Sequence, residues 1–490
     1  MLFVLSLLFI GIALAHGYFY SCALQLKNYR NREIFSVVTK SMTIDAAALC
    51  VNALACFICY AFVSLDYYAA FYFVLLLPSL AAVVVKAVVF KKVNVDFTRR
   101  MKTIAVTYGI LVLVLSALLT VFVPTALGGV ACLTLPLLIA ANSFTLPFFK
   151  NKNKRYLDAA KEKLKRVNPL IIAVTGSGGK TTVKNMLSVL LAEKGKTYAT
   201  PKSYNTPLGI ATSVSAMDED VKIFVAEFGA RKTGDIKELV DLFKPNIGVL
   251  TSIAAQHVET FGSIENVAKE KLSLIQATEK AFVSSSVDYD LPPNAIKVKE
   301  ENIRIKRLDV YGTAFDYIFD GETFEVETEL LGLNNVYNLA LAITVAISLG
   351  VSAEYVRQSI PLVKPVPHRL EGMTSSGLRI IDDGYNVNPS GAEDAVRLLA
   401  TYPGRKIVTT SGFVETDDKE NEKFARFLSQ KVDVVIILGL KNRRALLAGL
   451  DGVEYHCVGD MEECKKLYAD ILMKGDALLI TANLPEEYCM

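Results

Sequence analysis

Residues 170–184 read LIIAVTGSGGKTTVK, and this stretch decides the fold of the larger part of the chain. The short apolar run at its start is typical of a buried strand, and helical spacing of apolar residues begins at Val183. Between them, glycines let backbone N–H groups turn toward phosphate oxygens, the helix N-terminus adds partial positive charge, and Lys180 adds a full charge. The order strand, glycine loop, helix therefore predicts a nucleotide phosphate site.

The loop departs from a strict Walker A motif, because Val174 stands where that motif has its first glycine. The match is instead to the shorter GxxGKTT form, in which a threonine hydroxyl such as that of Thr181 can bind Mg²⁺. We expect the ATP phosphates to contact Thr175, Gly176, Ser177, Gly178, Gly179, Lys180, Thr181 and Thr182. On its own, the loop indicates nucleotide binding and no particular reaction.

Two further apolar runs lead into side chains that can bind metal. Residues 222–226 precede Glu227, and residues 246–253 end shortly before His257. In a parallel sheet the carboxyl ends of strands share one edge, which is also where the glycine loop lies. Glu227 and His257 are therefore candidate Mg²⁺ ligands, able to neutralise charge during phosphoryl transfer. For Glu227 taken alone, a surface carboxylate is the competing interpretation.

The first 150 residues have a different composition from the rest. Apolar stretches of about 20 residues, long enough to cross a bilayer, lie near 2–24, 44–63, 68–90, 103–123 and 126–148. They predict an α-helical membrane domain over 1–150. Lysines and arginines gather in alternate connections and again from Lys150 to Arg166, so the positive-inside rule predicts an N-terminus outside and cytoplasmic domains after Lys150.

Several other classes of protein are disfavoured. The chain has 53 Lys and Arg against 50 Asp and Glu, which gives no basic footprint for nucleic acid. Cys56 and Cys59 form a CxxC pair, but inside an apolar membrane-length run, where small buried residues are the simpler interpretation. Residues 151–167 form a basic linker helix, which could lie on anionic lipid or be a solvated connection.

The motifs along residues 168–480 resemble those of the Mur ligase family. Beyond the glycine loop, the resemblance rests on Asn205-Thr206-Pro207-Leu208-Gly209, Glu227-Phe228-Gly229-Ala230, Gly234-Asp235-Ile236, His257, Phe261-Gly262-Ser263, Gly332-Leu333-Asn334-Asn335-Val336-Tyr337-Asn338, Pro367-His368-Arg369-Leu370-Glu371 and Asp382-Asp383-Gly384-Tyr385-Asn386-Val387-Asn388-Pro389-Ser390. It implies a P-loop-containing central domain over 168–364 and a Rossmann-like α/β C-terminal domain over 365–490. The alternation of strands and helices agrees with this.

The resemblance also implies roles for single residues. Lys271 is the expected carbamylated lysine, which would bind a second Mg²⁺, and Lys269 is the alternative. Asn335 and Asn338, which lie three residues apart on the same helical face, would hold the adenine, because side-chain amides can both donate to and accept from a base edge. The remaining implied contacts are Asp383 to the ribose, Arg369 to the phosphates, and Asn205, Thr206, Asn386 and Asn388 to substrate.

The implied reaction is ATP-dependent amide formation between a carboxylate and an amine through an acyl phosphate. The expected partners are a peptidoglycan precursor, an amino acid or dipeptide such as D-Ala-D-Ala, and membrane lipid. The usual uridine-nucleotide-binding domain is replaced by the membrane domain, so the substrate is either nucleotide-linked or lipid-linked.

Departures from the family pattern leave alternatives open. Asn334 replaces a His, Gly384 a Ser and Val387 an Ala, and residues 481–485 replace a Lys-Gly-Ser segment. The first alternative is an ATP-binding membrane scaffold for wall synthesis that has lost ligation. The others are a ligase for a different lipid-linked substrate, or a folylpolyglutamate-type or amidating ligase.

Overall fold

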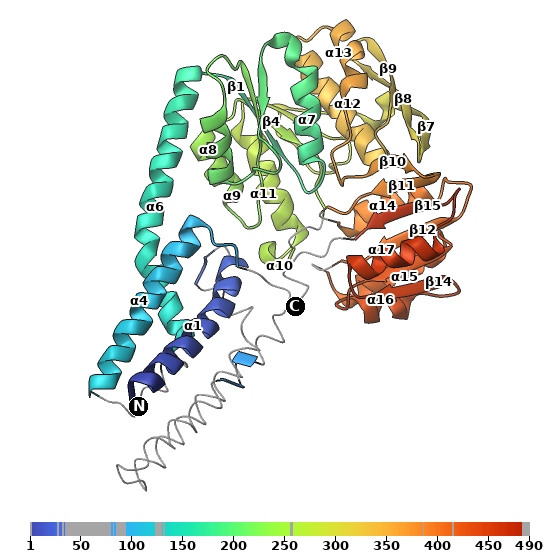
Figure 1. Ribbon diagram of the computed structural model, residues 1–490. Coiled ribbons are helices and arrows are strands. Elements are labelled where there is room, and N and C mark those ends of the chain that lie inside the picture. Colours follow the sequence, from blue (N-terminus) through green and yellow to red (C-terminus); the bar gives the residue numbers. More distant parts are fainter. Residues whose placement is uncertain are drawn as a thin grey trace. The chain divides into compact units, whose positions relative to one another are not determined.

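The computed structural model describes residues 2–26, 29–31, 34, 80–81, 83–84, 95–122, 130, 133–254, 258–385, 387–413 and 416–482 (Figure 1). The chain divides into two compact units. The first comprises Met1–Lys154 and Pro485–Met490, and the second comprises Arg155–Leu484. Each unit is described by itself.

The N-terminal unit contains long apolar helices. These are α1 (Leu2–Leu26), α4 (Arg99–Phe122) and the first part of α6 (Thr134–Val167). By length and composition, two segments could cross a membrane, Ser6–Gln25 and Arg99–Phe122. The spans predicted near 44–63 and 68–90 fall outside the described residues, apart from four positions between 80 and 84. Most of the span predicted at 126–148 belongs to α6.

Helices α1 and α4 pack closely because small residues face aromatic ones. A Cβ added to Gly17 would lie 2.4 Å from the ring of Tyr108. The hydroxyl of Tyr108 donates a hydrogen bond of 2.7 Å to the carbonyl of Ala13, and Ser6 and Thr120 share one of 3.2 Å. These contacts satisfy buried polar groups between two apolar helices.

A polar cluster joins α4 and α6 to the chain after α1. The guanidinium of Arg100 lies 4.1 Å from the ring centroid of Tyr29. The buried amide of Asn142 donates to the carbonyl of Tyr29 at 2.9 Å and to the side chain of Asn31 at 2.7 Å. This cluster fixes the ends of three segments that are far apart in sequence.

The last turns of α6 belong to the second unit. Ala160 and Leu164 are buried in an apolar cluster with Met217 and Val214 of the following domain. Lys163 donates to the carbonyls of Ser215, at 3.1 Å, and of Met217, at the end of α8 (Pro207–Ala216). Cations favour helix C-termini, so this contact stabilises the junction. The apolar stripe of the basic stretch thus packs on protein.

The middle domain is built on a six-stranded parallel sheet in the order β2-β3-β1-β4-β5-β6. Alternate residues of β1 face opposite layers, as the period of a strand requires. Ile172 and Val174 face α7, while Ile171 and Ala173 face α8, α9 and α11. The strands are β1 (Leu170–Thr175), β2 (Thr197–Ala199), β3 (Ile223–Glu227), β4 (Ile247–Leu250), β5 (Lys280–Val283) and β6 (Ala295–Lys297); the helices are α7 (Lys180–Leu190), α9 (Asp235–Phe243), α10 (Val258–Phe261) and α11 (Ile264–Ala277).

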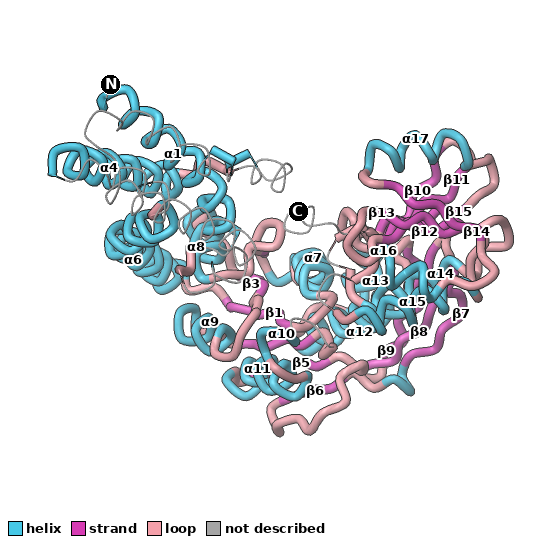
Figure 2. Tube along the Cα trace, turned by 90° about the horizontal axis from the view of Figure 1, so that it is seen from below, coloured by secondary structure: helices cyan, strands magenta, loops and turns pink. Residues whose placement is uncertain are grey.

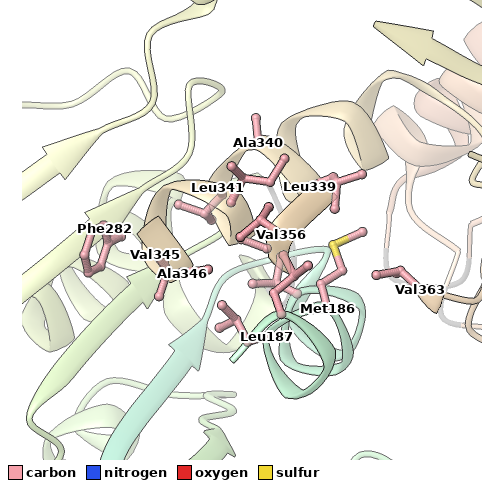
Figure 3. Packing of buried hydrophobic residues seen from close by; sticks show 14 of the residues in the cluster. Met186, Leu187, Phe282, Leu339, Ala340, Leu341, Val345, Ala346, Val356 and Val363 are labelled. Carbon is pink, nitrogen blue, oxygen red and sulfur yellow. The ribbon is translucent and has the colours of Figure 1, made fainter. Parts of the chain in front are cut away.

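Helix α12 (Leu333–Ser348) connects this sheet to a small antiparallel one. Its residues Leu339 and Ala346 pack with Met186 and Leu187 of α7, as Figure 3 shows. On its other side α12 meets the three-stranded sheet of β7 (Ile303–Asp309), β8 (Gly312–Phe319) and β9 (Glu322–Thr328). Helix α13 (Ala353–Ser359) completes this layer.

The C-terminal domain is a second six-stranded sheet, in the order β10-β11-β15-β12-β13-β14 (Figure 2). Only β10 runs antiparallel to its neighbour. Helices α14, α15 and α16 cover one face and α17 covers the other. The strands are β10 (Glu371–Ser375), β11 (Leu378–Asp382), β12 (Lys406–Thr410), β13 (Val434–Leu438), β14 (Glu454–Val458) and β15 (Ala477–Thr481); the helices are α14 (Pro389–Leu399), α15 (Asp418–Ser429), α16 (Arg443–Gly449) and α17 (Met461–Ile471).

Candidate active site

The glycine loop lies between the end of β1 and the start of α7. Gly176 and Gly179 have φ values of +154° and +76°, which side chains rarely adopt. A Cβ on Gly176 would come within 2.0 Å of the Thr251 hydroxyl, and one on Gly179 within 2.7 Å of the Asn338 amide oxygen. The loop is therefore enclosed by the chain after β4 on one side and by α12 on the other.

The segment after β4 holds the loop through several hydrogen bonds. The Ser252 hydroxyl accepts from the N–H of Gly178 at 2.8 Å, and the Ser177 hydroxyl donates to the Ala254 carbonyl at 3.0 Å. Thr251 donates to the carbonyls of Thr175, at 3.2 Å, and of Gly178. Thr251 and Ser252 are not among the predicted site residues, although two hydroxyl residues directly after an apolar strand were a usable signal.

Lys180 folds back over the loop that it follows. Its ammonium donates to the carbonyls of Gly176 at 2.6 Å and of Ser177 at 3.3 Å. Burial lowers the pKa of Lys180 to about 8, while Glu227 opposes this shift and Arg369 adds to it. The amine thus lies within the loop's curve, where a phosphate oxygen would meet it.

Glu227, at the end of β3, is a buried carboxylate with several partners. One oxygen accepts from the Thr181 hydroxyl at 2.9 Å and from the Lys184 ammonium at 3.4 Å. The other oxygen accepts from the Asn205 amide at 3.1 Å. The predicted proximity of Glu227 to Thr181 is therefore present. Asn205, which was predicted to contact substrate, also bonds to Glu227, and Lys184 joins the group as a residue for which no role was predicted.

Lys271 and its neighbours on α11 have different environments. Lys271 is buried, and no hydrogen bond or ion pair joins its ammonium to any described residue. Burial, reinforced by the charge of Lys180, lowers the pKa of Lys271 to about 7. Lys269 is exposed. Between them, Glu270 accepts from the N–H groups of Gly234 at 2.8 Å and Ile236 at 2.7 Å, which caps α9 and fixes this turn of α11.

Two predicted site residues, His257 and Asn386, lie outside the described residues. Within the described part of the chain, no group of three His, Cys, Asp or Glu side chains forms a ready-made metal cluster. The metal-binding groups that the structure does bring together are the Thr181 hydroxyl and the Glu227 carboxylate.

The two predicted adenine residues lie beside each other on α12. The amide of Asn338 donates to the Asn335 side chain at 3.4 Å, as the spacing of three residues predicts. Asn335 also donates to the Leu331 carbonyl at 2.8 Å. Asn338 faces Gly179 of the glycine loop. Asn334 turns away and donates to Asp394 of α14 at 2.7 Å.

Arg369 lies in the segment that leads into the C-terminal domain. Its neighbours His368 and Leu370 have φ values of +61° and +50°, in the left-handed region that non-glycine residues seldom occupy. The Arg369 guanidinium lies 4.6 Å from the ring centroid of Tyr385. Asp383 accepts from the N–H of Leu370 at 3.0 Å.

The charge environment connects Arg369 to the glycine loop. Its guanidinium contributes to the lowered pKa of Lys180, so the two cations are close enough to interact. Burial raises the pKa of Asp383 to about 7, against the opposing effect of Arg369. The structure thus brings together Arg369, just before β10, and Asp383, just after β11, near the start of the C-terminal domain.

Two predicted substrate residues serve as helix caps. The Thr206 hydroxyl accepts from the N–H of Gly209 at 3.3 Å at the start of α8. The Asn388 side chain accepts from the N–H of Gly391 at 3.0 Å at the start of α14. Those atoms satisfy backbone donors, which leaves the amide NH₂ of Asn388 for any other contact.

The described residues fit a nucleotide phosphate with a bound divalent cation. The loop supplies positive-φ glycines and the ammonium of Lys180, and a hydroxyl and a carboxylate of the kind that Mg²⁺ prefers meet at Thr181 and Glu227. Lys271 is the remaining candidate, since its amine has no described partner.

Comparison with known protein families agrees with this geometry. Residues 174–346 match the profile of the Mur ligase middle domain, and residues 368–484 match that of the Mur ligase glutamate ligase domain. Together these regions cover more than half of the chain. The chain belongs to the Mur ligase family.

Among individual relatives, the chain is 29% identical over 345 residues to the UDP-N-acetylmuramoyl-tripeptide--D-alanyl-D-alanine ligase of Bacillus subtilis, covering 66% of this chain and 75% of the relative. It is 30% identical over 287 residues to the enzyme of the same name from Borreliella burgdorferi, covering 55% and 62%. The MurF ligase of Thermotoga maritima, solved in complex with ADP, superposes with a TM-score of 0.61 at 25% identity and covers 67% of this chain and 80% of that structure.

Proposed function

We propose that this protein is an ATP-dependent ligase that joins a substrate carboxylate to an amine, adding D-Ala-D-Ala or a related amine to a peptidoglycan precursor peptide. The observation that carries the proposal is the convergence of Lys180, Thr181 and Glu227 around one glycine loop. Relatives named as D-alanyl-D-alanine ligases of the tripeptide precursor support the choice of substrates.

The reaction would proceed in two displacements. The substrate carboxylate attacks the γ-phosphorus of ATP, the bond to ADP breaks, and an acyl phosphate forms. The amine then attacks the acyl carbon, phosphate leaves, and the amine loses a proton to give the amide. Lys180 would stabilise charge on the phosphoryl group, and Arg369 would add a second cation from the C-terminal domain.

Thr181, Glu227, His257 and Lys271 are the residues proposed to hold Mg²⁺, and the family resemblance implies two ions. When bound, Mg²⁺ neutralises phosphate charge and orients the oxygens. Asn335, Asn338 and Asp383 would hold the nucleoside, and Asn205, Thr206, Asn386 and Asn388 the substrate.

Lys271 is proposed to act as a carbamate. An amine must be neutral to attack CO₂, and a pKa of about 7 makes the neutral form abundant near physiological pH. The carbamate would carry a negative charge, which removes the repulsion between Lys271 and Lys180. The exposed Lys269 lacks the burial that produces this shift.

We also propose that the N-terminal unit is a multi-pass membrane domain with its N-terminus outside and the catalytic domains in the cytoplasm. Support comes from the two membrane-length helices and the distribution of lysines and arginines. A membrane domain suits a precursor already linked to lipid, so membrane lipid would be part of the substrate.

The test uses the full chain in detergent micelles with ATP, Mg²⁺ and D-Ala-D-Ala. Nucleotide-linked and lipid-linked tripeptide precursors are offered separately, and ADP, phosphate and the peptide product are measured. We expect ADP and phosphate to form only when both carboxylate and amine are present. Equal turnover with neither substrate would contradict the proposal, and preference for one precursor identifies the substrate form.

Two lysine substitutions distinguish the ligase from a scaffold that still binds ATP but no longer forms the amide bond. Lys271→Ala should reduce amide formation by at least about a hundredfold, because a metal-binding group is lost. Lys269→Ala, two residues away and exposed, is the matched control and should stay within about twofold. Full cellular function of Lys271→Ala would favour the scaffold.

A further inference from the structure

Lys184 lies one helical turn after Lys180 on α7, and the charges of Glu227 and Arg369 act on both lysines. Lys184 is only 1% exposed. Burying an ammonium to this extent costs free energy unless a carboxylate or several acceptors compensate it. Lys184 has a carboxylate partner and one further acceptor, because it pairs with Glu227 at 3.4 Å and donates to the carbonyl of Lys202 at 2.5 Å.

Glu227 needs a cation even without bound metal. It is 1% exposed, and its other described contacts, to Thr181 and Asn205, come from neutral groups. Lys184 is the cation that forms an ion pair with it in the described part of the chain. Without Lys184, the buried carboxylate would lose this ion pair and keep only the more distant charge of Lys180.

Lys184 and Glu227 also fix the loop that precedes α8. Lys184 binds the carbonyl of Lys202, whose φ of +48° is in the left-handed region. Glu227 binds the side chain of Asn205 three residues further on. The loop 202–205 is therefore attached at both ends to the same buried ion pair, and Ser203 between them lies 3.4 Å from the hydroxyl of Tyr385 in the C-terminal domain.

We propose that Lys184 is a positioning residue: a resident counter-cation that holds Glu227 until metal binds and couples the metal site to the loop 202–205. The inference rests on the proposed role of Glu227 as a metal ligand. Lys184 and a divalent cation compete for the same carboxylate oxygen, so binding of metal weakens the ion pair. Because Lys184 also donates to the carbonyl of Lys202, a metal that displaces Lys184 from Glu227 also changes the contact that holds the loop 202–205.

The experiment measures binding of Mn²⁺, a spectroscopic substitute for Mg²⁺, to the full chain in micelles without nucleotide. Electron paramagnetic resonance gives the dissociation constant. Lys184→Met should bind Mn²⁺ about tenfold more tightly than the native protein, because a competing charge has been removed. Lys184→Arg, which keeps the charge, should stay within about threefold of native affinity.

The matched control is Lys280→Met, which removes a partly buried lysine bonded to the Ser348 carbonyl at 3.2 Å. Its Mn²⁺ affinity should equal that of the native protein. Hydrogen exchange of residues 200–206 is the second measurement. Lys184→Met should exchange faster there before metal is added, and native protein should approach that rate on addition of Mn²⁺.

Unchanged or weaker Mn²⁺ binding in Lys184→Met would overturn the inference, as would loop exchange that responds neither to the substitution nor to metal. If Lys184→Met does not fold, the exchange response of native protein and of Lys184→Arg still decides the coupling. Glu227→Gln separates the two proposals. Undiminished Mn²⁺ binding in that variant refutes the metal role of Glu227 itself, whereas lost binding there with no change in Lys184→Met refutes only the role of Lys184.

Discussion

At the carboxyl edge of the middle sheet, β1 leads into the glycine loop, which lies beside Lys180, Lys184 and Glu227. At the carboxyl edge of the C-terminal sheet, β12 ends at Thr410 and is followed by Ser411 and Gly412. There, Asn442 donates to the Ser411 carbonyl at 2.9 Å, and the Gly412 N–H donates to Thr410 at 3.1 Å. The middle sheet thus buries charge at the end of β3, whereas the groups named at the end of β12 are neutral and bond to one another.

The two sheets share a parallel architecture, but the charged and neutral groups at their carboxyl ends suit different roles. Parallel strands offer a crevice at their carboxyl ends in both domains, but at the end of β12 the side chains of Thr410 and Asn442 are engaged in hydrogen bonds within the domain. In the C-terminal domain the predicted site residues are Arg369, which precedes β10, and Asp383, which follows β11. The chemistry is therefore expected at the middle sheet, with the second domain contributing its entry segment.

The largest expected effect on turnover comes from removing the charge of Lys180 at the carboxyl edge of the middle sheet. Lys180→Ala should lower ATP-dependent amide formation by about a thousandfold, because a cation at the transferring phosphoryl group is lost. Steady-state phosphate release with both substrates measures it. Asn442→Ala at the other edge should leave turnover within about twofold and lower the free energy of unfolding by about 1–3 kcal/mol. Similar turnover losses in both variants would remove the distinction.

A glycine at each edge gives a second comparison. Gly179→Ala places a Cβ 2.7 Å from the Asn338 amide at φ +76°, and Gly412→Ala places one 2.3 Å from the Asn421 amide at φ +67°. Both should destabilise by about 1–3 kcal/mol. Only Gly179→Ala should also weaken ATP binding, by about tenfold, because it distorts the phosphate loop. Calorimetric titration with ATP checks this, and an equal loss at Gly412 would contradict it.

The pH should affect the middle domain through the protonation state of Lys271 on α11. Its pKa of about 7 means that the ammonium predominates below that pH and the amine above it. At constant dissolved CO₂, the carbamate signal in ¹³C NMR should grow with the neutral fraction, which rises about tenfold from about pH 6 to about pH 8. Lys271→Ala should lack the signal, and a signal that is flat across this range would argue against the titration of Lys271.

The smallest effects should come from the two helix caps. Thr206→Ala at α8 and Asn388→Ala at α14 each remove a side chain that accepts from a backbone N–H. Each should lower the free energy of unfolding by about 1 kcal/mol, measured by urea denaturation. If these residues also bind substrate, KM for the precursor will rise in the same variants, and an unchanged KM would limit them to capping.

The sequence predicts much of the middle domain because its signals are local. A strand, a glycine loop and a helix follow one another within residues 170–190, and the continuous apolar run of β1 is buried against helices on both faces of the sheet. The grouping of Thr181 with Glu227 followed from the rule that parallel strands share an edge.

Long-range partners could not be predicted in the same way. Lys184 has the periodicity of an ordinary helix residue, and nothing local shows that its amine meets a carboxylate 43 residues away. The hydroxyls of Thr251 and Ser252 likewise acquire a role only when β4 lies beside β1. Burial also separates Lys271 from Lys269, and burial depends on the packing of α11 rather than on its sequence alone.

The uninterrupted course of α6 has a practical consequence for protein engineering. A soluble fragment that starts at residue 168, where the first strand is about to begin, would lose Ala160 and Leu164 from the core. It would also lose the bonds from Lys163 to the end of α8. A fragment that starts near residue 150 keeps these contacts. The choice of starting residue therefore decides whether the isolated catalytic part retains its native packing when it is used for inhibitor screening.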